Sequence, residues 1–466
     1  MPLPPRGKSP QIPASLLADL WRLSPDRVGE HLNHGKFVRY PHIQFMGKRI
    51  AQTVAQKHAR MVISMPPRHG KSWLISAWTP VWFLSHFPDR NVILTSYEAD
   101  FAATWGRYVR NLIAEYGDQL GVCLMDDSKA SNRWNTPQGG GMVTAGIGGP
   151  ITGRGADLII VDDPVKNWEQ AMSELQRQKT IEWFNSTLYT RAEPGASILV
   201  LMTRWHERDL AGYLLNEHED DWKELRLPAR AEENDPLGRE YGAPLCPERF
   251  GLDALTQYQK ALGSQMWNAL YQQRPSAQEG NLVKRDWWKF YRALPARFDT
   301  VIQSWDLAFK SAVTSDFVVG QVWGKLGPNK YLIDQVRRRI DFPDTIREVR
   351  NLSARYPIAN RKLIEDTANG PALIAMLQKE MGGIIPVKPN GSKELRVSAV
   401  SAEIESGNVF LPDPATSSWV KDFIDEFANF PNCANDDQVD AASQALFHLK
   451  GAGIPFAPRM GKTQSW

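Results

Sequence analysis

A short polar sequence, Arg-His-Gly-Lys-Ser, follows an apolar run at residues 61–65 and precedes a second, largely apolar segment at 74–82. This order predicts a strand, a phosphate-binding loop and a helix. Gly70 lets the backbone turn without a side chain in the way of an anion, which the amides at the helix start can then bind. Lys71 can reach the β- and γ-phosphates of a nucleotide, and the Ser72 hydroxyl can bind Mg²⁺.

The usual loop pattern begins with glycine five residues before the Gly-Lys pair, where this chain has Met65. The loop therefore requires support from acids on a second strand. Asp162 and Asp163 directly follow the apolar run 158–161, and in an open α/β sheet ligands bind at the carboxyl ends of the strands. Asp162 is expected to organise Mg²⁺ and Asp163 to polarise the attacking water. A turn with helix-capping acids is the alternative.

Three further polar residues are candidates around this loop. Arg154 precedes the acidic strand and is the candidate arginine finger, in cis or on a neighbouring subunit, with a surface arginine as the alternative. The seven glycines between Trp134 and Gly155 predict a mobile loop with tight turns. Thr203 ends another apolar run and can sense the γ-phosphate. Gln44 offers the donor and acceptor that an adenine edge requires, unless it is a surface glutamine.

The second half of the chain predicts a different sheet. Three consecutive strands joined by short turns are expected between residues 301 and 339, and helices alternate with strands up to residue 412. Two helices follow at 419–430 and 436–450. Acids fall on the first strand, at the end of the fourth strand and at the start of the last helix: Asp306, Glu365, Asp366, Asp436, Asp437 and Asp440.

Acids brought together from these three places can hold two divalent cations for in-line phosphodiester cleavage. Asp306 should project alone into the cleft because its strand neighbours point to the opposite face. For the same reason only one of Glu365 and Asp366 can point inward. On the last helix Asp437 is preferred over Asp440, and Asp436 is expected to cap the helix. Each acid by itself has a capping or solvated role as the alternative.

Basic residues near these acids are candidates for contact with duplex phosphates, which would give sequence-independent and salt-sensitive binding. Solvated surface charge is the alternative. The candidates are Arg337, Arg338, Arg339, Lys388, Lys393 and Arg396.

Composition limits the class of protein. A chain of 466 residues with 42% hydrophobic and 23% charged residues is typical of a globular protein with two or three domains. The net charge of +3 requires any nucleic-acid surface to be a local patch. Three distant cysteines provide no zinc or disulfide spacing, which favours a reducing compartment. The Pro-rich basic start predicts neither a signal peptide nor an anchor, and no apolar stretch is long enough to span a membrane.

As a set, the motifs resemble those of the large terminase subunit of tailed bacteriophages, a DNA-packaging ATPase with a fused nuclease. The resemblance extends from Tyr40 to Leu449 and is carried by MPPRHGKS, TSY, GRGADLIIVDDPVKN, LMTRWHERDL, ALYQQRP, SWDLAF, IEDTANG and DDQVDAASQAL. Two departures stand out. The loop lacks its first glycine, and Asp163 occupies the position of a second acid that is most often Glu in such motors.

The resemblance implies an α/β fold in two domains. A P-loop ATPase domain with a mainly parallel sheet is expected at 36–275, and an RNase H-like nuclease domain with a mixed sheet at 284–450. A linker at 276–283 would join them. An N-terminal tail and helix at 1–35 and a flexible C-terminal tail at 451–466, which can dock a portal in this family, complete the expected organisation.

The resemblance also implies cofactors and partners. ATP with Mg²⁺ is expected in the first domain, and two Mg²⁺ or Mn²⁺ ions on the acids of the second. The expected partners are double-stranded viral DNA, a portal protein, a small terminase subunit and further copies in a ring on the procapsid, in the host cytoplasm and without a membrane. An arginine within the loop, here Arg68, is usual for the family. The expected nucleotide contacts are Gln44, Pro67, Arg68, His69, Gly70, Lys71, Ser72 and Asp162, with catalytic roles for Arg68, Arg154, Asp163 and Thr203.

Two alternatives remain. A DNA repair or recombination translocase with a fused nuclease would need a second motor domain, and no second series of motor motifs follows residue 229. A non-enzymatic assembly factor would have no need of an intact Lys71, Ser72 and Asp162 together with the full acidic set.

Overall fold

The computed structural model describes residues 20–450 apart from residues 57, 129, 152, 276–281, 308–316, 367–369, 390, 432 and 434. The predicted C-terminal tail, the first 19 residues of the N-terminal segment and most of the predicted linker lie outside the described residues. The chain divides into two compact units, with Thr256–Gln265 grouping with the second. None of the helices described is both long enough and apolar enough to cross a membrane.

The first unit contains a seven-stranded sheet in the order β3-β4-β2-β5-β6-β1-β7. Neighbouring strands are parallel except for the antiparallel edge pair β3 and β4, which confirms the predicted mainly parallel sheet. The strands are β1 (Arg60–Ser64), β2 (Asn91–Ser96), β3 (Arg133–Asn135), β4 (Gly141–Gly146), β5 (Ala156–Asp162), β6 (Ala192–Met202) and β7 (Lys223–Arg226).

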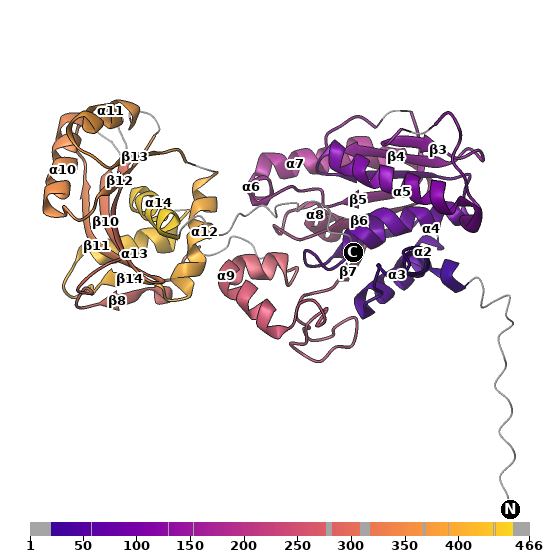
Figure 1. Cartoon of the computed structure of the whole chain (residues 1–466), viewed down its shortest axis with the longest axis horizontal. Helices are drawn as coiled ribbons and strands as arrows, with labels where there is room; N and C mark the ends of the chain where they lie inside the picture. The colour runs from indigo at the N-terminus through magenta and orange to yellow at the C-terminus, as the bar shows by residue number, and fades with distance from the viewer. Residues whose placement is uncertain are drawn as a thin grey trace, which may run out of the picture. The chain divides into compact units, whose positions relative to one another are not determined.

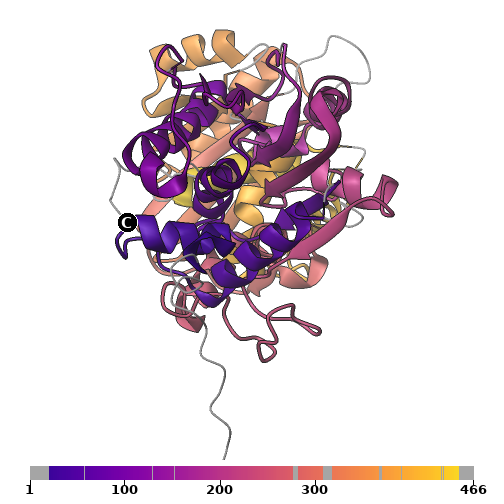
Figure 2. The same cartoon turned by 90° about the vertical axis from the view of Figure 1, so that its right-hand side faces the viewer.

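Helices bury both faces of this sheet, which is why its central strands are almost continuously apolar. Met61 and Ile63 of β1 pack with helices of one layer, and Val62 packs with those of the other. Figure 1 shows α5 along the face of β4, and Figure 2 shows the indigo helices α2 and α3 side by side. The first layer comprises α2 (Pro25–Leu32), α3 (Pro41–Val54), η2 (Trp73–Trp78), α4 (Thr79–His86) and α5 (Ala99–Leu120), and the second includes η3 (Phe184–Leu188) and α8 (Leu210–Glu217).

The glycine-rich stretch predicted as a mobile loop contains β3 and β4, so this expectation is corrected. β4 pairs with β2 from Asn91↔Gly141 to Ser96↔Gly146. Glycine is unfavourable in strands, but a Cβ at Gly141 would lie 2.3 Å from the Trp134 carbonyl oxygen. The glycine there permits the close approach of β3.

The second unit contains another seven-stranded sheet, in the order β13-β12-β9-β10-β11-β14-β8. β9, β10 and β11 form the predicted antiparallel meander, and the remaining neighbours are parallel. This mixed sheet was predicted, except for β8. The strands are β8 (Lys289–Tyr291), β9 (Thr300–Leu307), β10 (Val318–Leu326), β11 (Asn329–Arg338), β12 (Arg361–Glu365), β13 (Ile384–Val387) and β14 (Val409–Pro412).

Helices also cover both faces of the second sheet (Figure 1). Trp305 of β9 faces one layer and Ile302 the other. The first layer contains α10 (Phe342–Arg355) and α11 (Gly370–Glu380), and the second contains α12 (Lys393–Glu405), α13 (Trp419–Asn429) and α14 (Asp437–Lys450). The remaining helices are α6 (Trp168–Met172), α7 (Glu174–Trp183) and α9 (Leu252–Leu270), the last interrupted by non-helical backbone at Gly263.

Candidate functional site

The loop between β1 and η2 has the backbone that its sequence predicts. Gly70 has φ +86°, in the left-handed region that favours glycine. Arg68 is exposed and has φ +63°, a conformation that is uncommon for a residue with a side chain. Met65, at the position of the missing first glycine, is fully buried in the core under the first helix layer. Packing therefore explains the apolar residue at that position.

The side chain of Lys71 is buried and joins the ends of two strands. Its ammonium lies 2.8 Å from both carboxylate oxygens of Asp163 and donates a hydrogen bond to the Thr203 hydroxyl. Asp163 Oδ1 also accepts from the Thr203 amide at 2.8 Å. The structure thus brings together three residues that were predicted from separate motifs, at the carboxyl edge of the sheet.

Asp162 is fully buried and held by two hydroxyls. Ser72 Oγ donates to Asp162 Oδ1 at 3.1 Å, and Ser76 Oγ donates to Oδ2 at 2.7 Å. Burial, followed by the nearby Asp163, raises the pKa of Asp162 to about 7 although Ser76, Lys71 and Ser72 act in the opposite direction. Ser76 was not predicted. Its spacing of four residues from Ser72 on a helix was the available signal.

Two buried histidines support the loop from below. His42 Nε2 lies 2.9 Å from the His69 carbonyl oxygen, and His69 Nδ1 lies 2.9 Å from the Pro67 carbonyl oxygen. Burial lowers the pKa of each histidine to about 4, so both imidazoles are neutral near pH 7. His69 also stacks on Phe250. Among the predicted nucleotide contacts, His69 is therefore placed under the loop by its packing.

Gln44 lies on the exposed side of α3, and its amide donates to the Arg39 carbonyl oxygen at 2.7 Å. A small cavity beside Gly70 is lined by Tyr40 and Ile43 from the same helix and by Arg249. The adenine-reading role of Gln44 stays a prediction.

Arg154 lies at the other edge of the sheet, so a role in cis at this loop is not supported. Its Nη1 donates to Asn91 Oδ1 at 3.4 Å, and Asn91 is the first residue of β2. β2 and β5 are parallel, so Arg154 precedes β5 at the amino edge while Asp162 ends β5 at the carboxyl edge. Seven strand residues separate the two edges by about 20 Å. Burial and then Arg133 lower the pKa of Arg154.

The residue after Thr203 connects this edge of the sheet to the segment after α9, a link that the sequence did not predict. The Arg204 amide donates to Gln273 Oε1 at 3.0 Å, and Arg204 Nε lies 3.0 Å from both carboxylate oxygens of Asp209. All three residues are buried. The segment that leaves the first unit is thus fixed to the strand that contacts Lys71.

In the second unit the predicted acids converge on Asp306. Burial raises the pKa of Asp306 well above its usual value, followed by Asp440, Glu365 and Asp437 as neighbouring charges. Ser304, on the same face of β9, donates to the Ala441 carbonyl oxygen of α14 at 2.7 Å. First strand, fourth strand and last helix therefore meet as predicted, and Asp440 acts on Asp306 more strongly than Asp437 does.

The remaining acids of the set have different surroundings. Asp366 is not among the neighbouring charges that act on Asp306, which places Glu365 in the cluster. Asp436 precedes α14, and its carboxylate pairs with Lys393 at 2.6 Å. Among the described residues, no three His, Cys, Asp or Glu side chains are arranged to hold a metal ion. In this arrangement basic side chains neutralise the acids.

Several predicted DNA-contacting residues are engaged within the fold. Lys393 and Arg396 point into the acidic cluster. Arg337 Nη2 lies 2.9 Å from Glu426 Oε2, and Arg339 lies over the ring of Phe317. These contacts do not favour a purely solvated surface for these residues.

Glu426 of α13 holds the start of the helix that carries Asp437 and Asp440. Its Oε1 accepts from the Gln438 amide at 2.7 Å, and its Oε2 accepts from Gln438 Nε2 at 2.6 Å and from Arg337. Burial raises the pKa of Glu426. The sequence offered no signal for this residue, because its partners are distant in the chain.

We expect Glu426→Ala to lower the free energy of unfolding by about 2–4 kcal/mol, because Arg337 and the Gln438 amide lose their buried acceptor. The value is at the lower end for a broken buried pair because the Arg337 side chain is 22% exposed. Urea unfolding of the full chain measures it. Asp422→Ala, at an exposed position of the same helix, is the matched control and should change little. Equal losses in the two variants would contradict the role of Glu426.

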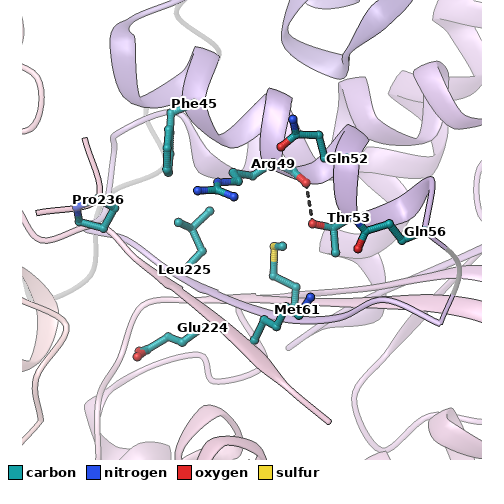
Figure 3. Close-up of a pocket in the computed structure, with 10 residues that line it drawn as sticks. Phe45, Arg49, Gln52, Thr53, Gln56, Met61, Glu224, Leu225 and Pro236 are labelled. Atoms are coloured by element: carbon teal, nitrogen blue, oxygen red, sulfur yellow. Dashed lines mark hydrogen bonds between the residues drawn. The ribbon is translucent and has the colours of Figure 1, made fainter. Parts of the chain in front are cut away.

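A cavity of about 810 Å³ lies between α3 and the edge strand β7. Figure 3 shows Phe45 and Arg49 of α3 above Leu225 of β7, with Thr53 bonded to the Arg49 carbonyl oxygen. None of the lining residues belongs to the loop at 65–72 or to the acidic strand end. This cavity is therefore separate from the chemistry of Lys71 and Asp162.

Comparison with known proteins yields two family models. The model described as terminase large subunit, T4likevirus-type, N-terminal, matches residues 62–290, and the terminase RNaseH-like domain model matches residues 303–449. No curated protein matches.

Solved structures with similar folds include the large terminase of a thermophilic bacteriophage, at 14% identity and TM-score 0.47 over 85% of this chain and 94% of that chain. The large terminase of bacteriophage HK97 matches at 11% identity and TM-score 0.35, covering 78% and 84%. The large terminase nuclease domain from bacteriophage SPP1 with bound Mn matches at 16% identity and TM-score 0.28, covering 36% and 98%.

Proposed function

The chain belongs to the phage terminase large subunits, which combine an ATPase domain with an RNase H-like nuclease domain, and from this we propose that it drives DNA packaging. In this proposal the first unit hydrolyses ATP to translocate double-stranded DNA into a procapsid, and the second unit cuts that DNA. The observation that carries the proposal is the placement of two separate sets of candidate catalytic residues, one in each compact unit.

We infer the order of events at the first site from the contacts of Lys71. Its ammonium occupies both carboxylate oxygens of Asp163. The triphosphate of ATP offers Lys71 a more highly charged partner, so binding would draw the ammonium away from Asp163. Asp163 is then free to accept a hydrogen bond from water and orient it towards the γ-phosphate.

Loss of the Lys71 contact would also reach Thr203, whose hydroxyl shares the same ammonium. The next residue, Arg204, is bonded to Gln273 after α9. The state of the nucleotide can therefore be transmitted through Thr203 and Arg204 to the segment that leaves the first unit. Ser72 and Asp162 would hold the Mg²⁺ that accompanies ATP, and this ion neutralises charge on the phosphates.

In the second unit, the carboxylates of Asp306, Glu365, Asp437 and Asp440 form the donor set that Mg²⁺ or Mn²⁺ prefers. The raised pKa of Asp306 supports this fit, since a cluster of acids that disfavours its own ionisation gains from a cation. Two such ions, when bound, supply an activated water and stabilise the leaving oxygen. Glu426 keeps α14 in register with β9, so that Asp437 and Asp440 stay opposite Asp306.

As a member of a packaging motor, the chain would act with a portal protein, a small terminase subunit and further copies of itself in a ring. It would work in the host cytoplasm, transiently on the procapsid. The proposal is tested with purified protein and plasmid DNA, in Mg²⁺ or Mn²⁺, with and without ATP. Both phosphate release and DNA cleavage are expected. A folded protein that shows neither activity would favour a non-enzymatic assembly factor.

We expect Arg154 to act in trans, because it lies at the opposite sheet edge from Lys71 of its own chain. Arg154→Ala should lower ATP turnover by about 10³-fold while ATP still binds. Mixing Arg154→Ala with Lys71→Ala should restore part of the activity, because one variant supplies the arginine and the other the intact loop.

The neighbouring Arg133, which is exposed, provides the control. Arg133→Ala should hydrolyse ATP at close to the wild-type rate. Unchanged hydrolysis by Arg154→Ala would return Arg154 to the role of an ordinary surface arginine.

A further inference from the structure

Two basic side chains of α12 enter the acidic cluster of the second unit. Lys393 Nζ lies 2.6 Å from Asp436 Oδ2 and 2.7 Å from Asp440 Oδ2. Arg396 Nη2 lies 2.7 Å from Asp440 Oδ1, and its Nη1 lies 3.8 Å from Glu365 Oε2. Because the two residues are three apart on a helix, they share one face and reach the cluster together.

These contacts occupy both carboxylate oxygens of Asp440, whose side chain is only 4% exposed. A divalent cation binds carboxylate oxygens at about 2.0–2.6 Å. An ammonium at hydrogen-bond distance from the same oxygen would then lie within a few ångströms of the cation, and the two positive charges would repel. Lys393 and a cation on Asp440 Oδ2 therefore exclude each other.

The two basic residues differ in their freedom to leave. The Lys393 side chain is 44% exposed and has a flexible stem, so its ammonium can swing into water. The Arg396 side chain is 16% exposed and lies between Asp440 and Glu365. Lys393 is the displaceable partner, and Arg396 is placed to keep the two acids at a fixed separation.

We propose that Lys393 is a built-in counter-ion of the acidic cluster, which occupies Asp440 until a divalent cation displaces it. The proposal rests on the metal-dependent nuclease proposed above and adds a competition at one of its ligands. Lys393 stabilises the metal-free cluster by neutralising repulsion, and it weakens cation binding by the same contact. In this way the site is loaded only when the cation concentration is high enough to outcompete an intramolecular ammonium.

The test measures Mn²⁺ binding to the metal-stripped full chain by isothermal titration calorimetry without DNA. Lys393→Met removes the charge and keeps a long side chain. Its Mn²⁺ affinity should rise by about tenfold, as expected for removal of a competing charge beside a carboxylate. Its Tm in EDTA should fall below that of wild type, and saturating Mn²⁺ should narrow this gap.

Two further variants make the result specific. Lys393→Arg keeps the positive charge, so its Mn²⁺ affinity should stay within about threefold of wild type. Lys421→Met removes an exposed lysine of α13 in the same unit and should change neither quantity. An unchanged or lower Mn²⁺ affinity in Lys393→Met would overturn the competition while leaving the nuclease proposal intact. Absence of Mn²⁺ binding in wild type and all variants would instead overturn the metal-dependent nuclease, and the competition with it.

Discussion

Lys71→Ala is expected to lower ATP hydrolysis by at least about 10²-fold, the usual effect of removing one preorganised positive donor from developing negative charge. The Lys71 ammonium is buried between Asp163 and Thr203, so no other described side chain is positioned to replace it. Phosphate release with saturating ATP and Mg²⁺ measures the change.

Metal-dependent DNA cleavage by Lys71→Ala should stay close to wild type, because the acidic cluster belongs to the other compact unit. Lys48→Ala, at an exposed position of α3, is the matched control and should retain both activities. A folded Lys71→Ala protein that loses cleavage as well would point to one composite site and contradict the division of labour between the two units.

Asp306→Asn is expected to abolish DNA cleavage and leave ATP hydrolysis near wild type. The substitution keeps the shape of the side chain and removes the charge on which the other acids converge. A cation bridging from β9 to α14 would lose a central ligand. Conversion of supercoiled plasmid in Mn²⁺ measures cleavage, and phosphate release from the same preparation provides the internal control.

The same variant should be more stable than wild type when metal is removed. The folded-state pKa of Asp306 is raised, so its contribution to stability is fully present below its unfolded value and is lost as the pH rises through the folded value. Asparagine does not titrate. In EDTA the Tm advantage of Asp306→Asn should therefore grow as the pH is raised from about 4, and it should shrink towards acid pH.

Cleavage at the wild-type rate in Asp306→Asn would remove Asp306 from the metal site. A Tm advantage that grew as the pH fell would contradict the repulsion among the acids, whatever the cleavage result. Asp422→Asn, an exposed substitution of the same kind on α13, should alter neither quantity.

Local patterns predicted most of the second unit. β9, β10 and β11 are largely apolar runs that follow one another along the chain, and α14 follows a polar segment with acids in its first turn. Such signals depend on residues close in sequence. The order of strands and helices, and the positions of the acids along it, could therefore be predicted.

Some elements escaped because tertiary contacts override local preference. β4 contains glycine at both ends and was predicted as loop, but its neighbours β2 and β3 provide the hydrogen bonds and burial that its own side chains do not. The three-residue strand β8 exists because it pairs with β14, more than a hundred residues later.

The sequence by itself determined which side chains could do chemistry and in what order they follow the strands, because residue type and local periodicity are written in it. Only the tertiary structure decided which of them meet. It paired Lys393 with Asp440, moved Arg154 to the amino edge of its sheet, and brought Ser76 to Asp162. These pairings join residues far apart in the chain, so they depend on how strands are ordered within a sheet and not on local sequence.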